Sequence, residues 1–222
     1  MTMQLGMVGT DGIVLASDKL WADNRTAIRT PLIGTKFRIN HECGIAVACS
    51  GSMRTSEQLA DEIIALTLRD ANWVSNNLGA MQELGERLFS SVEQGREDAR
   101  CLVVFTRPEL KMYVIWTAKF DGTWGITGKA TEAIAYSGDM ANPAVFWGAA
   151  YYCPTPIAQM MFLAAHLILS AAPLNSAGVG GLEIALCTSD GIREVSEETL
   201  ANLKAKSAAL DKNIAFALLG DS

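Results

Sequence analysis

The sequence is poor in histidine and has no paired cysteine motif, and these shortages exclude several kinds of site. The 222 residues include only two histidines, His41 and His166, far apart in the chain. Such isolated imidazoles are too few for a structural zinc site and give a serine nucleophile no partner. The five cysteines form no Cys-x-x-Cys pair, and their number is odd. We therefore expect no metal, no cofactor and mostly inert buried thiols in a reducing compartment, with a reactive Cys49 as the alternative.

The sequence also lacks an excess of positive charge and a long unbroken apolar run. Eighteen Lys and Arg stand against 24 Asp and Glu, a net charge of −6, and no basic stripe is visible. This balance argues against nucleic acid as a partner. The most apolar stretch, 157–172, is interrupted by polar residues and is shorter than the ~20 residues that a bilayer requires. We expect a buried helix there, no membrane partner and, because no signal-peptide pattern opens the chain, a cytoplasmic location.

Apolar residues are plentiful, since they make up half of the chain. A chain of this length predicts a single domain, residues 1–222, that can bury roughly 70–75% of its unfolded surface. We found no internal repeat, linker or low-complexity segment. The surplus of apolar residues is typical of a subunit with buried interfaces, although a large core would also account for it.

The beginning of the chain carries the pattern from which a function can be argued. Thr2 follows Met1, and removal of Met1 would leave a free α-amine beside the β-hydroxyl of the same residue. Threonine with its own terminal amine is a known activated nucleophile. Residues 5–9 and 13–16 are predicted strands, joined by an Asp11-Gly12 turn that favours a hairpin. A terminus paired into a sheet is held in place, whereas most chain ends fray.

This segment resembles the proteasome β-type peptidases, a branch of the N-terminal nucleophile hydrolases. Among their relatives, the small bacterial homologues of the Anbu and BPH type are nearer to it than the true 20S β subunits. Later segments match more weakly but in the right order, at 34–39, 46–51, 136–139 and 182–195. The specific matches are Thr2, Gly6, Asp11, Gly12, the run 13–17 and Asp18, without a gap.

The resemblance implies a set of catalytic residues. Thr2 is the nucleophile, and its amine takes the hydroxyl proton through a water. Asp18 holds a lysine whose ammonium keeps that amine neutral by like-charge repulsion. The remaining roles are a serine and an aspartate that fix the amine and a glycine N–H in the oxyanion hole. The implied residues are Thr2, Asp18, Lys36, Ser137, Asp139 and Gly51.

Each of these residues also has an ordinary structural explanation. Asp18, Ser137 and Asp139 stand where turns are expected, and Lys36 is one of several cations in its region. The span from Asp18 to Lys36 is two residues longer than in the family, so an alignment without gaps places Thr35 at the lysine position. Residues 175–181 are Asn-Ser-Ala-Gly-Val-Gly-Gly, without the Asp-x-x-Ser that precedes the glycine pair in the family.

The order of predicted elements indicates separate layers of strands and helices. Strands, two helices, strands, two helices, strands and a last helix follow one another, without βαβ alternation. This order predicts an α+β fold, a four-layer αββα sandwich, and the resemblance implies the same. A capping box at 55–58 predicts a helix start at Thr55, and apolar residues at helical spacing continue this helix to about Arg69. Ser196 is expected to cap a last helix to about Leu210, followed by an apolar tail, 213–219, that packs on a surface the sequence does not identify.

The expected function is that of a threonine endopeptidase in a self-compartmentalised homo-oligomeric ring. Unfolded polypeptides or peptides are the expected substrates, and an ATPase unfoldase is a possible partner. The resemblance also places Trp21, Val47 and Met53 near the pocket for the residue that precedes the scissile bond. Two other functions remain open, a catalytically inactive ring or scaffold subunit and an amidase that acts on a small amide.

Overall fold

The computed structural model describes residues 2–21, 32–75, 77–91, 98–174 and 179–219. Their fold is α+β, with two antiparallel sheets of five strands each. The first sheet has the order β10 (Ile134–Gly138), β1 (Met3–Val8), β2 (Ile13–Ser17), β11 (Glu183–Thr188), β12 (Gly191–Glu194). The second has the order β5 (Phe37–Asn40), β6 (Ile45–Gly51), β7 (Ala99–Phe105), β8 (Lys111–Phe120), β9 (Thr123–Thr131). A small pair consists of β3 (Leu20–Trp21) and β4 (Leu32–Ile33).

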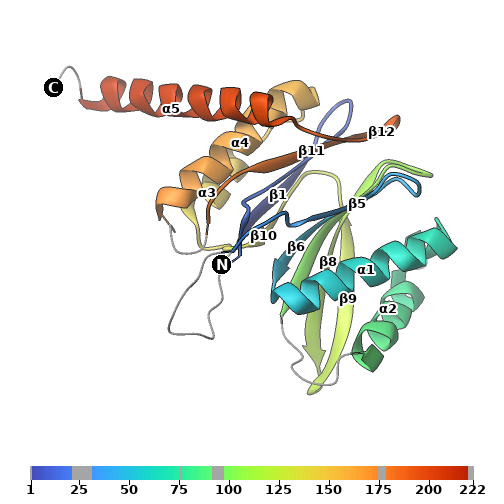
Figure 1. The fold of residues 1–222 in the computed structure, drawn as a ribbon. Helices are drawn as coiled ribbons and strands as arrows, with labels where there is room; N and C mark the ends of the chain where they lie inside the picture. The colour runs from blue at the N-terminus through green and yellow to red at the C-terminus, as the bar shows by residue number, and fades with distance from the viewer. Residues whose placement is uncertain (1, 22–31, 76, 92–97, 175–178, 220–222) are drawn as a thin grey trace.

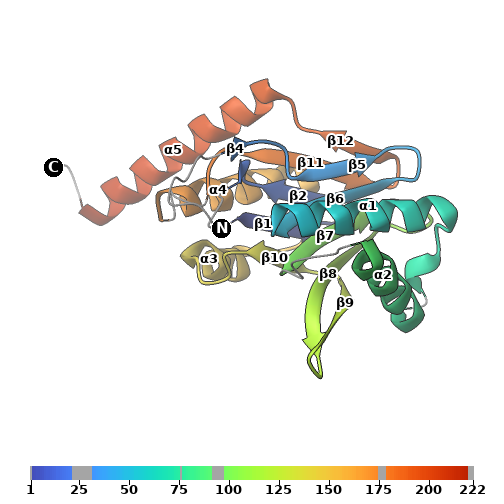
Figure 2. The ribbon, with the colours of Figure 1, turned by 60° about the horizontal axis from the view of Figure 1, so that its bottom comes forward.

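Helices lie over both sheets. The helices α1 and α2 contact the second sheet, and α3 and α4 contact the first, with α5 against α4 (Figures 1 and 2). Three buried apolar clusters correspond to this arrangement. One lies between the second sheet and its helices, one between the first sheet and its helices, and one between the two sheets. The bounds are α1 (Met53–Arg69), η1 (Trp73–Ser75), α2 (Asn77–Ser91), α3 (Pro143–Tyr151), α4 (Ile157–Leu174) and α5 (Glu197–Leu219).

The strand β1 lies inside the first sheet, between β10 and β2. Met3 pairs with Gly138 of β10, and Gln4 pairs with Ser17 of β2. The expected hairpin at Asp11-Gly12 is present between β1 and β2, closed by a hydrogen bond from the Gly9 N–H to the Gly12 carbonyl at 2.7 Å. The start of the described chain is therefore held on both sides by strand pairing.

The predicted start of α1 is wrong. The helix α1 starts at Met53, with Ser52 as its N-cap, so Thr55 lies inside the first turn. Gly51 explains the earlier start, because its φ of +94° turns the chain directly at the end of β6. The capping box thus gave the wrong start, although the predicted end at Arg69 is confirmed.

The helix α5 begins after Ser196 as expected, and the Ser196 hydroxyl accepts a hydrogen bond from the Thr199 N–H at 3.3 Å. It continues to Leu219, so the expected apolar tail is part of the helix. Residues 211–217 are exposed, because the later turns of α5 extend past the sheet (Figures 1 and 2). These side chains do not pack within the chain, so a surface that covers this tail, if there is one, belongs to another molecule.

The helix α4 is long and apolar enough, by length and composition alone, to cross a membrane. One third of it, 33%, is buried inside the fold. That buried face includes Met160, Ala164, Leu167, Ile168 and Ala171, and it packs against β1 and β2. The expectation of a buried helix is therefore confirmed only for this one face of α4.

Candidate active site

Thr2 lies at the beginning of β1, on the face of the first sheet that points toward the second sheet. Side chains alternate along a strand, so Met3, Leu5 and Met7 pack under the helices while Thr2 and Gln4 face the other way. Thr2 is 5% exposed. Its carbonyl accepts a hydrogen bond from the Asp139 N–H at 2.7 Å, which fixes the backbone of the residue.

The Lys36 side chain ends at the Thr2 hydroxyl. Its Nζ lies 2.8 Å from Thr2 Oγ1 and 2.8 Å from each carboxylate oxygen of Asp18. Both charged side chains are completely buried, with 0% exposure. Three oxygens around one nitrogen match the three N–H groups of an ammonium, whereas a neutral amine has only two. We therefore assign the charged form to Lys36.

Asp18 connects this lysine to the strand that carries Thr2. Its carboxylate accepts hydrogen bonds from the backbone N–H of Met3 at 2.8 Å and of Leu20 at 3.0 Å, in addition to those from Lys36. A fifth, longer hydrogen bond comes from the Gly180 N–H at 3.4 Å, and five bonds leave this carboxylate little freedom to turn. A short, rigid path therefore runs from the first peptide bond of β1 through Asp18 to the Lys36 ammonium.

Burial opposes the charge on both members of this pair. It raises the pKa of the Asp18 carboxyl, while the Lys36 charge and the hydrogen bonds lower it. It lowers the pKa of Lys36, while the charges of Asp18 and Glu183 raise it. A lysine that titrates below its ordinary range beside a hydroxyl is a common sign of a functional site.

Of the two residues that the sequence offers for the lysine position, Lys36 is the one at Thr2. Thr35 points elsewhere, and its hydroxyl donates to Glu183 Oε2 at 2.7 Å. The Lys36 N–H donates to the other oxygen, Glu183 Oε1, at 2.7 Å. Sequence reasoning missed Glu183. Its signal was a lone carboxylate at the start of an otherwise apolar strand, with no local partner.

Ser137 and Asp139 flank Gly138 at the end of β10, next to Thr2. The Ser137 hydroxyl is buried and forms a short hydrogen bond with the Ser50 hydroxyl of the second sheet. Gly138 has a φ of +99°, and a Cβ there would lie 1.9 Å from the Thr2 carbonyl oxygen. Only glycine therefore lets β10 approach this closely. Asp139 contributes its backbone N–H, as described above.

Gly51, the expected oxyanion donor, follows Ser50 at the end of β6 and so shares this end of the two sheets. Its φ of +94° gives it a structural reason to be glycine, because a Cβ would lie 2.2 Å from the Asp98 carbonyl oxygen. The segment 175–178, at which the resemblance expects an Asp-x-x-Ser, lies outside the described residues. The glycine pair that follows it, Gly180 and Gly181, is described. Among the residues that the structure does describe, no three His, Cys, Asp or Glu side chains gather as a metal site.

The three residues expected around the substrate pocket differ in their surroundings. The Lys36 ammonium lies 5.2 Å from the centroid of the Trp21 ring, and Trp21 is buried. Val47 is completely buried in the core under α1. Met53, at the start of α1, is 39% exposed. Only Met53 is thus open to a ligand in this structure, while Trp21 forms part of the wall around Lys36.

Comparison with known proteins shows the fold but no close sequence relative. The chain matches no protein-family model and no curated protein. Among solved structures it is similar to Anbu (ancestral β-subunit) from Yersinia bercovieri, with a TM-score of 0.70 and 14% identity over 99% of this chain and 97% of the other. The fold is that of the Anbu proteins.

A second Anbu structure agrees. It is a Gly-1 mutant from Hyphomicrobium sp. strain MC1, with a TM-score of 0.64 and 12% identity over 97% of each chain. The Anbu proteins are bacterial proteasome homologues, so the resemblance seen at the start of the sequence is confirmed at the level of the fold. Identities this low show the fold alone.

Proposed function

We propose that this protein is an N-terminal-threonine hydrolase that cleaves peptide bonds with Thr2. The observation that carries the proposal is the buried ammonium of Lys36, shared between the Thr2 hydroxyl and both oxygens of Asp18 at 2.8 Å. A surface ion pair would have no reason to end on the hydroxyl of the residue that precedes β1. The contacts of the helices with the two sheets support a four-layer αββα arrangement.

The mechanism requires that Met1 is removed, so that Thr2 has a free α-amine. The Thr2 oxygen attacks the substrate carbonyl, its proton passes to the amine through a water, and the Lys36 N–H stabilises the developing negative charge on the oxygen. The adjacent ammonium lowers the pKa of the amine by like-charge repulsion, which leaves it neutral and able to accept the proton. Ser137 and Asp139 orient the amine, and the Gly51 N–H binds the oxyanion.

The tetrahedral intermediate then collapses. The carbon–nitrogen bond of the substrate breaks, the leaving amine takes the proton from the α-amine of Thr2, and an ester to Thr2 remains. Water hydrolyses this ester by the same route in reverse and restores the hydroxyl. No step calls for a metal or a cofactor.

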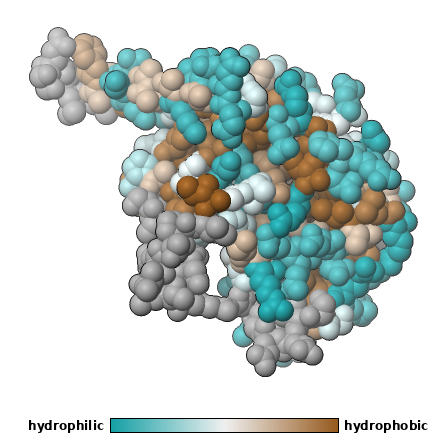
Figure 3. All heavy atoms as spheres, viewed as in Figure 1, coloured by the Kyte–Doolittle hydropathy of each residue, from teal (hydrophilic) through white to brown (hydrophobic). Residues whose placement is uncertain are grey.

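We further propose a homo-oligomeric ring in the cytoplasm that takes unfolded chains or peptides, with an ATPase unfoldase as a possible partner and with neither nucleic acid nor membrane. Exposed apolar side chains support self-association, above all Phe146 and Tyr151 of α3, at 73% and 69% exposure. On the face seen in Figure 3, hydrophobic patches lie between hydrophilic side chains. Residues of this kind on a soluble surface are typical of contacts between subunits.

Burst kinetics test the proposed function. We expect a chromogenic acyl substrate to release one equivalent of product per Thr2 in a rapid phase, because an acyl-enzyme accumulates. Thr2→Ala should remove the burst, and Thr2→Ser should keep a slower one because it retains a hydroxyl. N-terminal sequencing of the same sample should begin at Thr2.

Each alternative has its own outcome in this experiment. A chain that begins at Thr2 but gives no burst would be an inactive ring or scaffold subunit. A burst with small amides, and no cleavage of peptides of several residues, would identify an amidase.

A further inference from the structure

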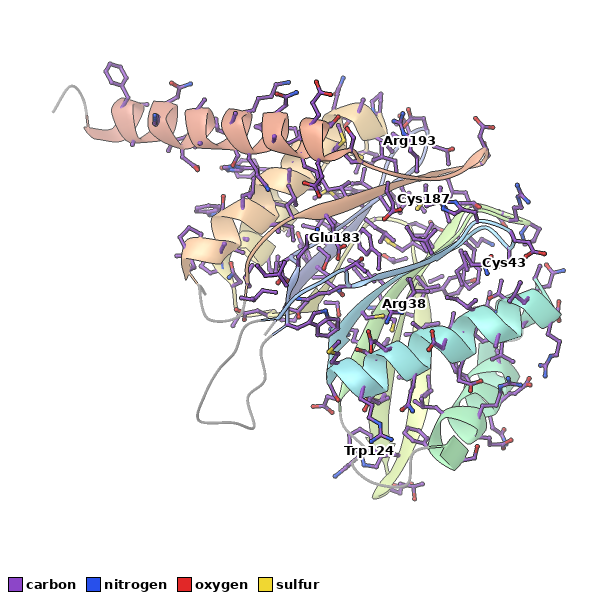
Figure 4. All side chains as sticks on the ribbon, in the orientation of Figure 1. Arg38, Cys43, Trp124, Glu183, Cys187 and Arg193 are labelled. Carbon is purple, nitrogen blue, oxygen red and sulfur yellow. The ribbon has the colours of Figure 1, made fainter. Side chains whose placement is uncertain are left out.

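Glu183 is a buried carboxylate whose partners lie next to the site described above. It is the first residue of β11, and the alternation along this strand turns Ile184 toward the helices and Ala185 toward the other sheet. Glu183 shares the side of Ala185, so it points between the sheets toward β5 (Figure 4). Its oxygens accept one hydrogen bond each, from the Lys36 N–H and from the Thr35 hydroxyl, both at 2.7 Å.

The segment that Glu183 holds has a particular need to be fixed. The strand β5 begins only at Phe37, and Lys36 is joined to β6 by its carbonyl, which accepts from the Cys49 N–H at 2.9 Å. The Lys36 N–H has the Glu183 carboxylate as its partner instead of a neighbouring strand. A slip by one residue in an extended segment turns every side chain to the other face. Such a slip would put Thr35 where Lys36 is now.

We propose that Glu183 is a positioning residue for the Thr2 reaction, which fixes the register of Thr35-Lys36 and thereby directs the Lys36 ammonium to the Thr2 hydroxyl. The inference rests on the proposed function for its catalytic part. The Thr35 hydroxyl completes the arrangement, since it donates to Glu183 and accepts from the Phe37 N–H at 3.1 Å. These hydrogen bonds hold Thr35 and Lys36 in one register, with the Thr35 side chain at Glu183 and the Lys36 side chain at Thr2.

The hydrogen bonds that Glu183 accepts from Thr35 and from the Lys36 N–H, called the clamp below, lie among charged groups that also affect the pKa of Lys36. Lys19 and Lys36 act on Glu183, and Asp18 and Glu183 act on Lys36. Burial raises the pKa of the Glu183 carboxyl, and its hydrogen bonds and these two lysines oppose the rise. The negative charge of Glu183 raises the pKa of Lys36. Loss of that charge should therefore let Lys36 lose its proton at a lower pH.

The test compares Glu183→Gln with a matched control, Glu194→Gln, an exposed residue of the adjacent strand β12. The probe is a β-lactone, and the readout is the rate of ester formation on Thr2 across a range of pH. We expect Glu183→Gln to slow acylation about 10- to 100-fold, because a displacement of ~1 Å in a positioned group can cost about 100-fold. We also expect the fall of the rate at high pH to begin at lower pH. Glu194→Gln should match the wild type in both respects.

A second pair of variants separates the effect of the hydrogen bonds from the effect of the Glu183 charge. Thr35→Val removes one hydrogen bond to Glu183 without changing any charge, and Thr35→Ser keeps it. We expect Thr35→Val to slow acylation, Thr35→Ser to restore the rate, and the double variant Glu183→Gln/Thr35→Val to lose little more than Glu183→Gln alone, since residues of one network are not additive. If Glu183 had a purely structural role, Glu183→Gln would lower the amount of folded protein but would not move the pH profile of acylation.

Hydrogen exchange at the Lys36 amide gives a readout that does not depend on activity. We expect this amide to exchange faster in Glu183→Gln than in the wild type, while the Cys49 amide keeps its protection. Equal acylation rates, pH profiles and amide exchange in wild type and Glu183→Gln would overturn the inference. If the wild type forms no ester at Thr2, the proposed function and the catalytic part of this inference both fall, and the exchange measurement alone decides whether the clamp exists.

Discussion

Lys36 is the residue on which the chemistry of this site depends, because it contacts both the candidate nucleophile and its counter-charge. A buried ion pair is a poor source of stability, but removal of one partner leaves an uncompensated charge in the core. For Lys36 that remaining charge would be the Asp18 carboxylate, which is 0% exposed. The lysine should therefore matter for folding as well as for reactivity.

We expect Lys36→Met to abolish acylation of Thr2 and to lower the free energy of unfolding by about 3 kcal/mol, as when one partner of a buried pair is lost. Urea denaturation and the acylation rate provide the two measurements. Lys129→Met, at an exposed position on β9, is the control and should change neither. A Lys36→Met variant that acylates as fast as the wild type would contradict the role assigned to the ammonium.

The pH dependence of acylation follows from the environment of Lys36. Burial lowers the pKa of this group below the ordinary lysine value of 10.5. The ammonium form is the active one in the proposed mechanism, so the rate should fall as the pH rises through this lowered pKa. The descending limb is therefore expected below pH 10.5, measured as acylation rate against pH. A rate that keeps rising past that pH would contradict the account, because it would mean that the neutral side chain of Lys36 is the active form.

At this scale the sequence allows the prediction of neighbours along one hairpin but not of partners from distant strands. Thr2 and Asp18 flank the open end of the β1–β2 hairpin, so their proximity follows from one turn. Lys36 was named from a family pattern, and its register could not be decided between Thr35 and Lys36. Glu183 decides it from 147 residues away in the chain, and no local pattern contains that information.

Among the elements, β10 approaches Thr2 closely at Gly138. Gly138 has the left-handed backbone, at φ +99°, and a close approach to the Thr2 carbonyl. Gly122, in the β8–β9 turn, also has a positive φ, +81°, but a Cβ at this position would meet nothing within 4 Å. Substitution of Gly122 therefore tests backbone strain alone, and substitution of Gly138 tests strain together with a steric clash.

We expect Gly122→Ala to cost roughly 1–2 kcal/mol of stability, the penalty for a side chain in the left-handed region, and to leave acylation unchanged. Gly138→Ala should cost more and should also slow acylation, since it must push Thr2 or β10 aside. Thermal unfolding and the acylation rate of both variants provide the comparison. Equal effects of the two substitutions on acylation would show that the contact with Thr2 is unimportant.

Elements with a strong local pattern were predicted well, and those formed by distant pairing were not. The β1–β2 hairpin and the end of α1 at Arg69 follow from a turn and from helical spacing. The strand β9 gives no clean alternation in the sequence, because of its glycines and half-exposed side chains, and only its pairing with β8 defines it. The start of α1 was misplaced because the turn at Gly51 overrides the capping pattern.

For the whole molecule, the helices of the first sheet carry several exposed apolar side chains. The helix α3 carries exposed Phe146 and Tyr151, and α5 extends past the sheet with Ile214 and Phe216 exposed. Both helices contact α4, so these side chains belong to the same helical layer. A monomer in water would gain nothing from exposing them.

We expect the protein to sediment as an oligomer and the Phe146→Ser/Tyr151→Ser variant to dissociate into smaller species at the same concentration. Sedimentation velocity measures this directly. Leu68→Ser, at an exposed apolar position of α1 on the other side of the molecule, is the control and should leave the assembly unchanged. A wild type that stays monomeric at high concentration would contradict the proposed ring.

The central claim is that the hydroxyl of Thr2 is a nucleophile activated by the ammonium beside it. Tandem mass spectrometry of the N-terminal peptide after treatment with a β-lactone tests this most directly. We expect a chain that begins at Thr2 and carries the probe as an ester on that residue, with no adduct after Lys36→Met. An unmodified Thr2 in a folded chain that has lost Met1, or a probe attached elsewhere, would contradict the account.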